Sequence, residues 1–84
     1  MTETEIRERV RGYLLDNLIA EEDAGSLDDK TELITGGILD SLATLNMVSF
    51  LKKEFGVALK AHEIDARTMD TIADIATLVA SRQG

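Results

Sequence analysis

The sequence contains no cysteine, no proline and no tryptophan, and its apolar runs are only a few residues long. Without cysteine, the fold can use neither disulfide bonds nor thiolate metal ligands, and no cysteine nucleophile is available. The apolar runs fall far short of the roughly 20 residues that span a bilayer, and Met1 is followed by Thr-Glu-Thr-Glu where a secretory signal would be basic. These absences predict a soluble cytoplasmic protein whose single domain, residues 1–84, is held together by apolar packing.

Basic side chains are also scarce, with 9 lysines and arginines against 16 aspartates and glutamates and a formal net charge of −7. A negative field of this size repels phosphate backbones and anionic lipid surfaces. We therefore predict no nucleic-acid partner and no membrane insertion. A helical DNA-binding domain would need a basic recognition helix, which the overall charge disfavours.

The first twenty residues have the pattern of one amphipathic helix. Thr2 and Glu5 stand three residues apart, the spacing of a capping box in which each side chain bonds the other residue's backbone N–H. Apolar residues then recur at every fourth position, which places them on one helix face. This stripe consists of Ile6, Val10, Leu14 and Leu18, widened by Tyr13 and Leu15. The pattern predicts a helix that ends near Ala20.

Helical periodicity fails between residues 21 and 40. Gly25, the Ser/Asp-rich stretch 26–31 and the Gly36-Gly37 pair are typical of turns, so this segment is predicted to be a long connection. Connections longer than about 12 to 15 residues are uncommon in small domains unless they have a function. Five apolar residues are scattered through this one, namely Leu27, Leu33, Ile34, Ile38 and Leu39. We expect them to pin the loop to the core.

A second main helix follows the loop. Asp40 is a good N-cap, so the helix is expected to begin at Asp40 or Ser41 and to stop at Gly56. Apolar residues then recur at three- and four-residue spacing, which predicts one buried stripe along this helix. The residues of this stripe are Leu42, Leu45, Val48, Leu51 and Phe55.

The last third of the chain predicts one short helix and one final helix. Residues 60–67 have room for a single helical turn with Ile64 facing the core. The final helix is expected to run from Thr68 or Asp70 to Ser81. Its apolar stripe is Met69, Ile72, Ile75, Leu78 and Val79. The chain is thus predicted to be all-α, with three main helices, one short third helix and a long loop between helices one and two.

Few residues could carry chemistry of their own. A hydrolase or transferase needs a nucleophile, a base and an orienting group within reach of one another. The single histidine, His62, lies beside Glu63 in a polar stretch and is predicted to be a surface residue. The acidic groups at 21–23 and 28–29 lack the alternating ligands and central glycine of an EF-hand loop and are interpreted as solvated charge. We predict no catalytic residue and no metal site.

One segment stands out, residues 36–42, which read Gly-Gly-Ile-Leu-Asp-Ser-Leu. The tripeptide Asp40-Ser41-Leu42, midway along a short acidic helical chain, resembles the modification site of acyl carrier proteins and their peptidyl and aminoacyl relatives. The resemblance covers nearly the whole chain, from the first helix through the loop and motif to the end of the second helix at Glu54-Phe55-Gly56 and the final helix. Read by itself, Asp-Ser is also an ordinary helix start.

The resemblance implies a four-helix bundle of acyl-carrier type that is not an enzyme. Ser41 would carry a 4'-phosphopantetheine arm, transferred from coenzyme A, on which cargo is held as a thioester. The implied partners are a phosphopantetheinyl transferase, an acyl- or amino-acid-activating ligase and a downstream synthase or transferase. The transferase would read Asp40 and Leu42. Asn46, Met47 and Lys53 of the second helix would meet the other enzymes, with Met47 exposed beside the serine, and the protein is expected to be a monomer.

The second helix departs from the pattern of carriers in primary fatty acid synthesis, which present a row of acids there. The corresponding face is neutral to basic, because it consists of Ala43, Asn46, Ser49, Lys52 and Lys53. The phrase Gly-Ile-Leu-Asp-Ser-Leu looks more like free-standing carriers of specialised polyketide, nonribosomal peptide or aminoacyl transfer pathways. The presence of Met1 and the short tail favour a free-standing chain. The alternative is an unmodified helical adaptor that binds a partner through the same surface.

Overall fold

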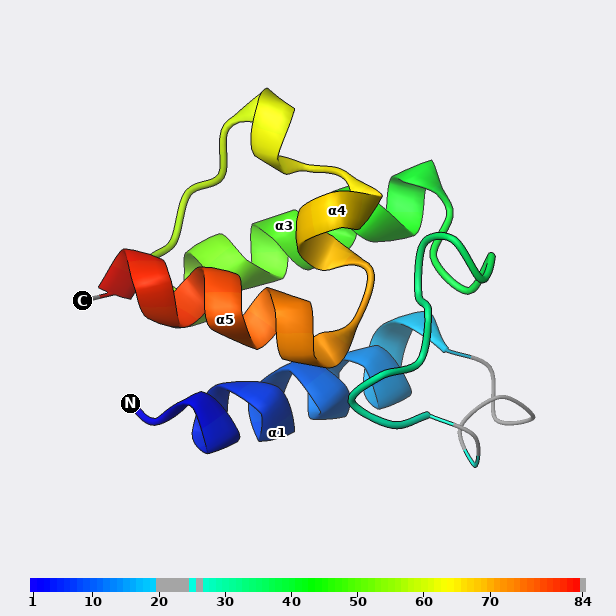
Figure 1. The fold of residues 1–84 in the computed structure, drawn as a ribbon, viewed down its shortest axis with the longest axis horizontal. Coiled ribbons are helices and arrows are strands. Elements are labelled where there is room, and N and C mark those ends of the chain that lie inside the picture. Colours follow the sequence, from blue (N-terminus) through cyan, green and yellow to red (C-terminus); the bar gives the residue numbers. More distant parts are fainter. Residues whose placement is uncertain (20–24, 26, 84) are drawn as a thin grey trace.

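The computed structural model describes residues 1–19, 25 and 27–83, and these form helices and no strand (Figure 1). The elements, in chain order, are α1 (Glu3–Tyr13), the π-helix η1 (Leu14–Leu18), α3 (Ser41–Phe55), the 3₁₀ turn η2 (Ala61–Glu63), α4 (Ala66–Met69) and α5 (Ile72–Gln83). The prediction of an all-α protein is confirmed, and the four α-helices are compatible with a small helical bundle.

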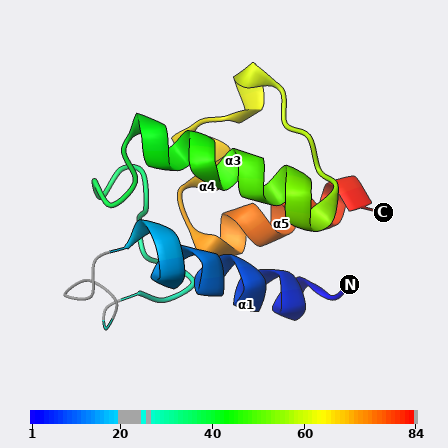
Figure 2. The same ribbon diagram turned by 180° about the vertical axis from the view of Figure 1, so that it is seen from behind.

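Helix α5 lies at the centre of the arrangement and contacts α1, α3 and α4. Figures 1 and 2 show α1 running antiparallel to both α5 and α3. The two chain ends lie together at one end of the molecule, and the N-terminus of α3 lies at the other. The described part of the loop, residues 27–40, wraps that second end, so loop and helix N-terminus together build one pole of the protein.

Among the described residues, the buried side chains are apolar except for one carboxylate. The members of the apolar core come from every main helix and from the loop. They are Ile6, Val10, Leu14, Ile19, Leu27, Leu33, Leu39, Met47, Leu51, Phe55, Val57, Met69, Ile72, Ile75, Ala76 and Val79. Burial on this scale supplies the main driving force for folding, since each fully buried aliphatic side chain contributes about 1.5 to 3 kcal/mol.

The first helix begins as predicted and continues into the π-helix η1. Thr2 Oγ1 accepts the Glu5 N–H at 3.2 Å, and the Glu5 carboxylate accepts the Thr2 N–H at 3.4 Å, which completes the capping box. The helical path continues through η1 to Leu18 and the chain is extended at Ile19, close to the predicted end near Ala20, which itself lies outside the described residues. The π-helix η1, which lies between α1 and Ile19, contains one extra residue in its turn compared with an α-helix. Ile19 is therefore buried and Leu18 is only half-buried. Leu15, expected to widen the stripe, is exposed.

The loop is pinned to the core as the sequence predicts. Leu27, Leu33 and Leu39 are buried, and Ile34 and Ile38 are half-buried. These side chains anchor the loop at several points along its described length.

One acidic side chain fixes the middle of the loop from 35 residues away. Asp70 Oδ1 accepts the N–H groups of Ile34 and Thr35, both at 2.9 Å, and Asp70 Oδ2 accepts the Thr35 hydroxyl at 2.7 Å. The Leu33 N–H is donated to the Asp70 carbonyl at 2.6 Å. The hydrogen bond from the Thr35 N–H is the main cause that lowers the pKa of Asp70 from its ordinary value.

The predicted final helix is interrupted at this contact. The expected single helix from Thr68 or Asp70 is split, because Met69 closes the short helix α4 and α5 begins only at Ile72. Asp70 lies between them, with its backbone carbonyl and carboxylate both bonded to the loop. The short third helix is likewise two pieces, the turn η2 and helix α4, of which the second is capped by Asp65 accepting the Arg67 N–H at 2.9 Å.

Asp70→Asn should weaken the fold and remove part of its acid sensitivity. Hydrogen bonds to a charged acceptor contribute more than neutral ones, so we expect the free energy of unfolding to fall by about 1 to 3 kcal/mol at pH 7. Since the folded pKa is lowered, the wild type keeps this contribution above about pH 5 and loses it as the pH falls through the folded pKa. Urea unfolding at pH 7 and pH 3 measures the difference. A variant as stable as the wild type at pH 7 would show that the hydrogen bonds between the loop and the Asp70 carboxylate do not stabilise the fold.

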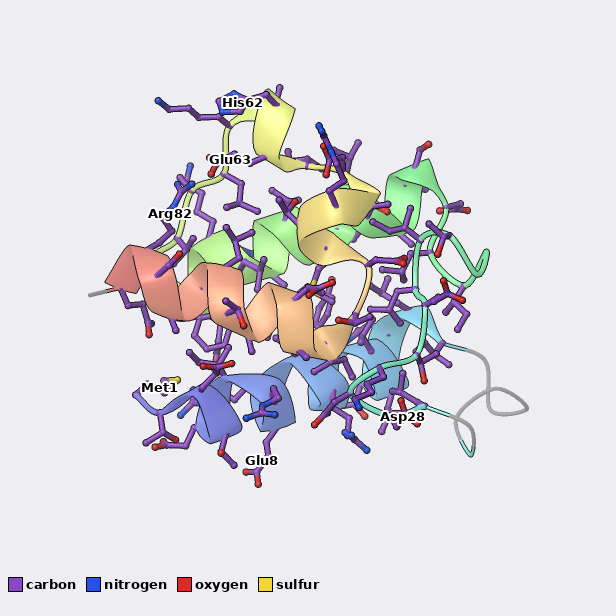
Figure 3. The ribbon with its side chains drawn as sticks, in the orientation of Figure 1. Met1, Glu8, Asp28, His62, Glu63 and Arg82 are labelled. Atoms are coloured by element: carbon purple, nitrogen blue, oxygen red, sulfur yellow. The ribbon has the colours of Figure 1, made fainter. Side chains whose placement is uncertain are left out.

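The buried carboxylate is Glu63, which the sequence did not single out. It pairs with Arg82 at the end of α5, whose Nη1 lies 3.2 Å from Glu63 Oε1, and it also accepts the Lys60 N–H. Figure 3 shows these two side chains meeting between η2 and α5, while His62 points away from them. The pair ties the 3₁₀ segment to α5. His62 is exposed, as predicted.

Arg82→Ala should destabilise the protein by about 1 to 3 kcal/mol, because it leaves the Glu63 carboxylate buried without its counter-ion. The matched control is Arg67→Ala, whose side chain is 88% exposed in its pair with Asp65 and should matter little. Thermal denaturation of both variants tests this. Equal melting temperatures for the two would mean that the Glu63 pair is no more than a surface contact.

Candidate functional site

Helix α3 begins at the pole that the loop encloses. Asp40 has extended backbone angles, and its Oδ1 accepts the Ala43 N–H at 2.8 Å, so it is the N-cap that the sequence predicted. The Thr44 hydroxyl donates to the Asp40 carbonyl at 2.8 Å and closes the first turn. Ser41 is therefore the first residue of the helix.

Two glycines shape the approach to this helix start. A Cβ at Gly36 would lie 2.2 Å from the Glu32 carbonyl oxygen, so any larger residue would force the loop apart. Gly37 has a φ of +80°, which side chains disfavour. The Leu39 N–H then bonds the Leu33 carbonyl at 2.7 Å, which fixes the chain just before the cap. The loop geometry thus determines where Ser41 lies.

Ser41 is exposed, and its hydroxyl takes part in no hydrogen bond with the described residues. The N–H groups of Ser41 and Leu42 belong to the first turn and have no intrahelical acceptor. Together with the aligned peptide dipoles, they make this end of α3 electropositive. An oxygen nucleophile at this position is accessible, and an anion attached to it would be stabilised.

The buried face of α3 differs from the predicted one. Leu42 and Leu45, expected in the core, are 68% and 55% exposed, whereas Met47, expected at the surface, is fully buried. The first half of the helix is apolar on several faces, so spacing alone does not select which face docks. Contact with α5 selects the face that contains Met47, Leu51 and Phe55. In this structure Met47 cannot touch a partner, and that part of the predicted recognition surface is wrong.

The other predicted contact residues on α3 are at the surface. Asn46 is exposed and its carbonyl accepts the Tyr13 hydroxyl at 3.3 Å, and Lys53 is exposed. The only acid of this helix, Glu54, forms an ion pair with Arg9. Phe50 is half-buried, and its ring stacks on Tyr13 with centroids 4.1 Å apart, so it links α1 to α3.

A pocket of about 530 Å³ opens beside Ser41, and we call it the Ser41 pocket. Its apolar walls are Ile34, Leu39, Leu45 and Ile64. Ser41 and Thr44 contribute hydroxyls, and Asp40 and Asp65 contribute carboxylates. The structure therefore brings together the loop, the start of α3 and the segment before α4. The sequence placed Asp40 and Ser41 here but gave no signal for Ile64 or Asp65, which lie more than 20 residues further along the chain.

Asp28 and Asp29, one of the two predicted acidic groups, form hydrogen bonds and ion pairs in the structure. Asp28 Oδ1 accepts the Lys30 N–H at 2.8 Å and the Thr31 hydroxyl at 3.2 Å within one turn. Asp29 pairs with Arg7 and Arg11 of α1 at 3.5 and 3.0 Å. Residues 21–23, the other predicted cluster, lie outside the described part of the chain.

No protein-family model matches this chain, and a search of curated proteins found no match either. Among the described residues, no helix is both long and apolar enough to cross a bilayer. The features that bear on function are therefore the motif, the fold and the geometry at Ser41.

Proposed function

We propose that this chain is a carrier protein that holds thioester-bound intermediates on a 4'-phosphopantetheine arm attached to Ser41. The observation that carries this proposal is an exposed serine hydroxyl, with no hydrogen bond to the described residues, on the first turn of a capped helix and beside a pocket with apolar walls. The Asp40-Ser41-Leu42 motif and the small all-α bundle support it. The protein positions the arm, and the thiol of the arm forms the thioester.

The residues present fit such a group. In the transfer, the Ser41 oxygen attacks the phosphorus that bears pantetheine in coenzyme A, a new P–O bond forms, and adenosine 3',5'-bisphosphate leaves. The hydroxyl proton passes to a base of the transferase. The resulting phosphodiester lies next to the free N–H groups at the start of α3, which favour its negative charge. Asp40 keeps the helix start fixed during the reaction.

Intact-protein mass spectrometry tests the proposal directly. The protein is incubated with coenzyme A and a broad-specificity phosphopantetheinyl transferase, and one added phosphopantetheinyl group is expected, located on Ser41 by peptide mapping. Addition at another residue, or none at all, would exclude the carrier function.

A second function, an unmodified helical adaptor, is favoured by one observation. Leu42 and Leu45 are large apolar side chains exposed next to each other at the start of α3. Neighbouring exposed apolar side chains of this kind are typical of protein interaction sites. The two functions differ in their need for Ser41, because an adaptor would bind its partner equally well without the hydroxyl.

Under the carrier proposal, Leu42→Ala should slow modification without weakening the fold. Leu42 is 68% exposed and lies next to the reacting hydroxyl, so the transferase is expected to bury it. Loss of one well-buried interface leucine costs about tenfold in kcat/KM, which initial rates of loading measure. The control is Leu15→Ala, which removes another exposed leucine that is distant from Leu42 in the sequence. Equal rates for both variants would show that the transferase does not read Leu42.

A further inference from the structure

The polar lining of the Ser41 pocket carries charge of one sign only. Asp40 and Asp65 are its ionisable residues, and no lysine, arginine or histidine is part of the described lining. Asp40 Oδ1 is used by the Ala43 N–H, which leaves Oδ2 available to a ligand. The remaining side chains of the lining are apolar or hydroxylic, so they can enclose a short carbon chain but offer no positive charge to an anion.

Arg67 compensates Asp65 only from outside the pocket. Its Nη2 lies 3.0 Å from Asp65 Oδ2, but the arginine side chain is 88% exposed and does not line the pocket. An ion pair this exposed is weak and screened by salt. The hydrogen bond from the Arg67 side chain lowers the pKa of Asp65, so the carboxylate is ionised at neutral pH.

The attachment point adds a third negative charge. If Ser41 carries a phosphopantetheine arm, as proposed above, the arm begins at the rim of the pocket. The cargo at its far end then either folds back into this pocket or stays in solvent. A cargo with a free carboxylate would bring like charge next to two carboxylates and a phosphodiester, whereas an ammonium group would be attracted by all three.

We propose that the Ser41 pocket selects the charge of the cargo, and that it receives short acyl groups with a protonated amine and leaves dicarboxylic cargo in solvent. The acyl chain lies against Leu45 and Ile64, and the ammonium group faces Asp65 and Asp40. This inference rests on the proposed attachment at Ser41 and narrows the cargo from acyl or aminoacyl groups in general to amine-bearing ones.

Three cargoes of nearly equal size test the charge dependence. Pantetheine analogues with a stable amide in place of the thioester are loaded onto Ser41 with β-alanyl, butyryl or succinyl ends, which carry a positive, a neutral and a negative group. Methyl NMR of Ile34, Leu45 and Ile64 then reports pocket occupancy. We expect shift changes from the β-alanyl cargo at least twofold larger than those from butyryl, and none from succinyl.

Two variants test whether the Asp65 carboxylate is responsible for the charge preference of the pocket. Asp65→Asn preserves the N-cap of α4, since asparagine caps as well as aspartate, and should bring the β-alanyl shifts closer to the butyryl level, with Asp40 and the phosphodiester retaining part of the attraction. Arg67→Gln releases Asp65 from its exposed partner and should increase them. Added salt at 0.5 M should weaken the preference, as screening requires (Debye length about 10 Å at 0.1 M).

The outcomes separate the inference from the function on which it rests. Failure to load any analogue at Ser41 would overturn the carrier function and the pocket proposal with it. Successful loading with identical shifts for all three cargoes, or an unchanged preference in Asp65→Asn, would overturn only the charge selection.

Discussion

Ser41→Ala is expected to abolish loading completely, which is the largest effect on function that the structure predicts. The hydroxyl oxygen is the atom that forms the new bond, and the other hydroxyl of the pocket, that of Thr44, is held by its hydrogen bond to the Asp40 carbonyl. The change should cost at most about 1 kcal/mol of stability, because Asp40 still caps the helix and Ser41 is exposed. Mass spectrometry of the variant after incubation with coenzyme A and transferase measures the loss, and circular dichroism verifies the fold.

The matched control is Ser49→Ala, which removes another exposed serine hydroxyl from the same helix. It should load at the rate of the wild type. If the two variants behaved alike, the hydroxyl at residue 41 would have no special role, and the adaptor function would become the better explanation. If Ser41→Ala lost its fold, loading of Ser41→Thr, which keeps a hydroxyl, would decide between structural and chemical roles.

Met47→Ala is expected to lower stability more than Asp70→Asn or Arg82→Ala. The Met47 side chain is fully buried, so truncation leaves a cavity that the rest of the core fills only in part. Large-to-small changes of this kind lower the free energy of unfolding by about 2 to 5 kcal/mol. Denaturant titration at neutral pH gives the value, and the protein is small enough for a two-state treatment.

Leu45→Ala is the paired experiment, because it lies two residues away on the same helix and is 55% exposed. It should change stability by no more than about 0.5 kcal/mol. A large loss for Leu45→Ala and a small one for Met47→Ala would mean that α3 is rotated about its axis relative to this structure. The pair therefore tests the helix orientation on which the Ser41 pocket depends.

The parts of the site that could be predicted are those with local causes. Asp40 caps the start of α3 by accepting the N–H of the residue three positions on. Gly56, with its φ of +71°, ends the same helix, so both ends of α3 follow from the nearby sequence. Ser41 is placed at the first turn for the same reason. The far wall of the pocket could not be predicted, because Ile64 and Asp65 reach it through the path of the chain after α3.

By itself, the sequence determined the helical class, the start of α1 at Thr2, the bounds of α3 and the apolar anchors of the loop. Capping boxes, N-caps and glycine stops act through hydrogen bonds and backbone angles within a few residues, so their effect is visible in the letters.

Only the tertiary structure decided which face of α3 is buried, where the final helix breaks and how Glu63 is neutralised. Each of these depends on a partner far along the chain. Met47 is buried because α3 docks on α5, α4 ends at Asp70 where this residue bonds the loop around Thr35, and Glu63 is accommodated by Arg82. Such contacts form only when the elements pack, and packing energy outweighs the modest local preferences that periodicity reports.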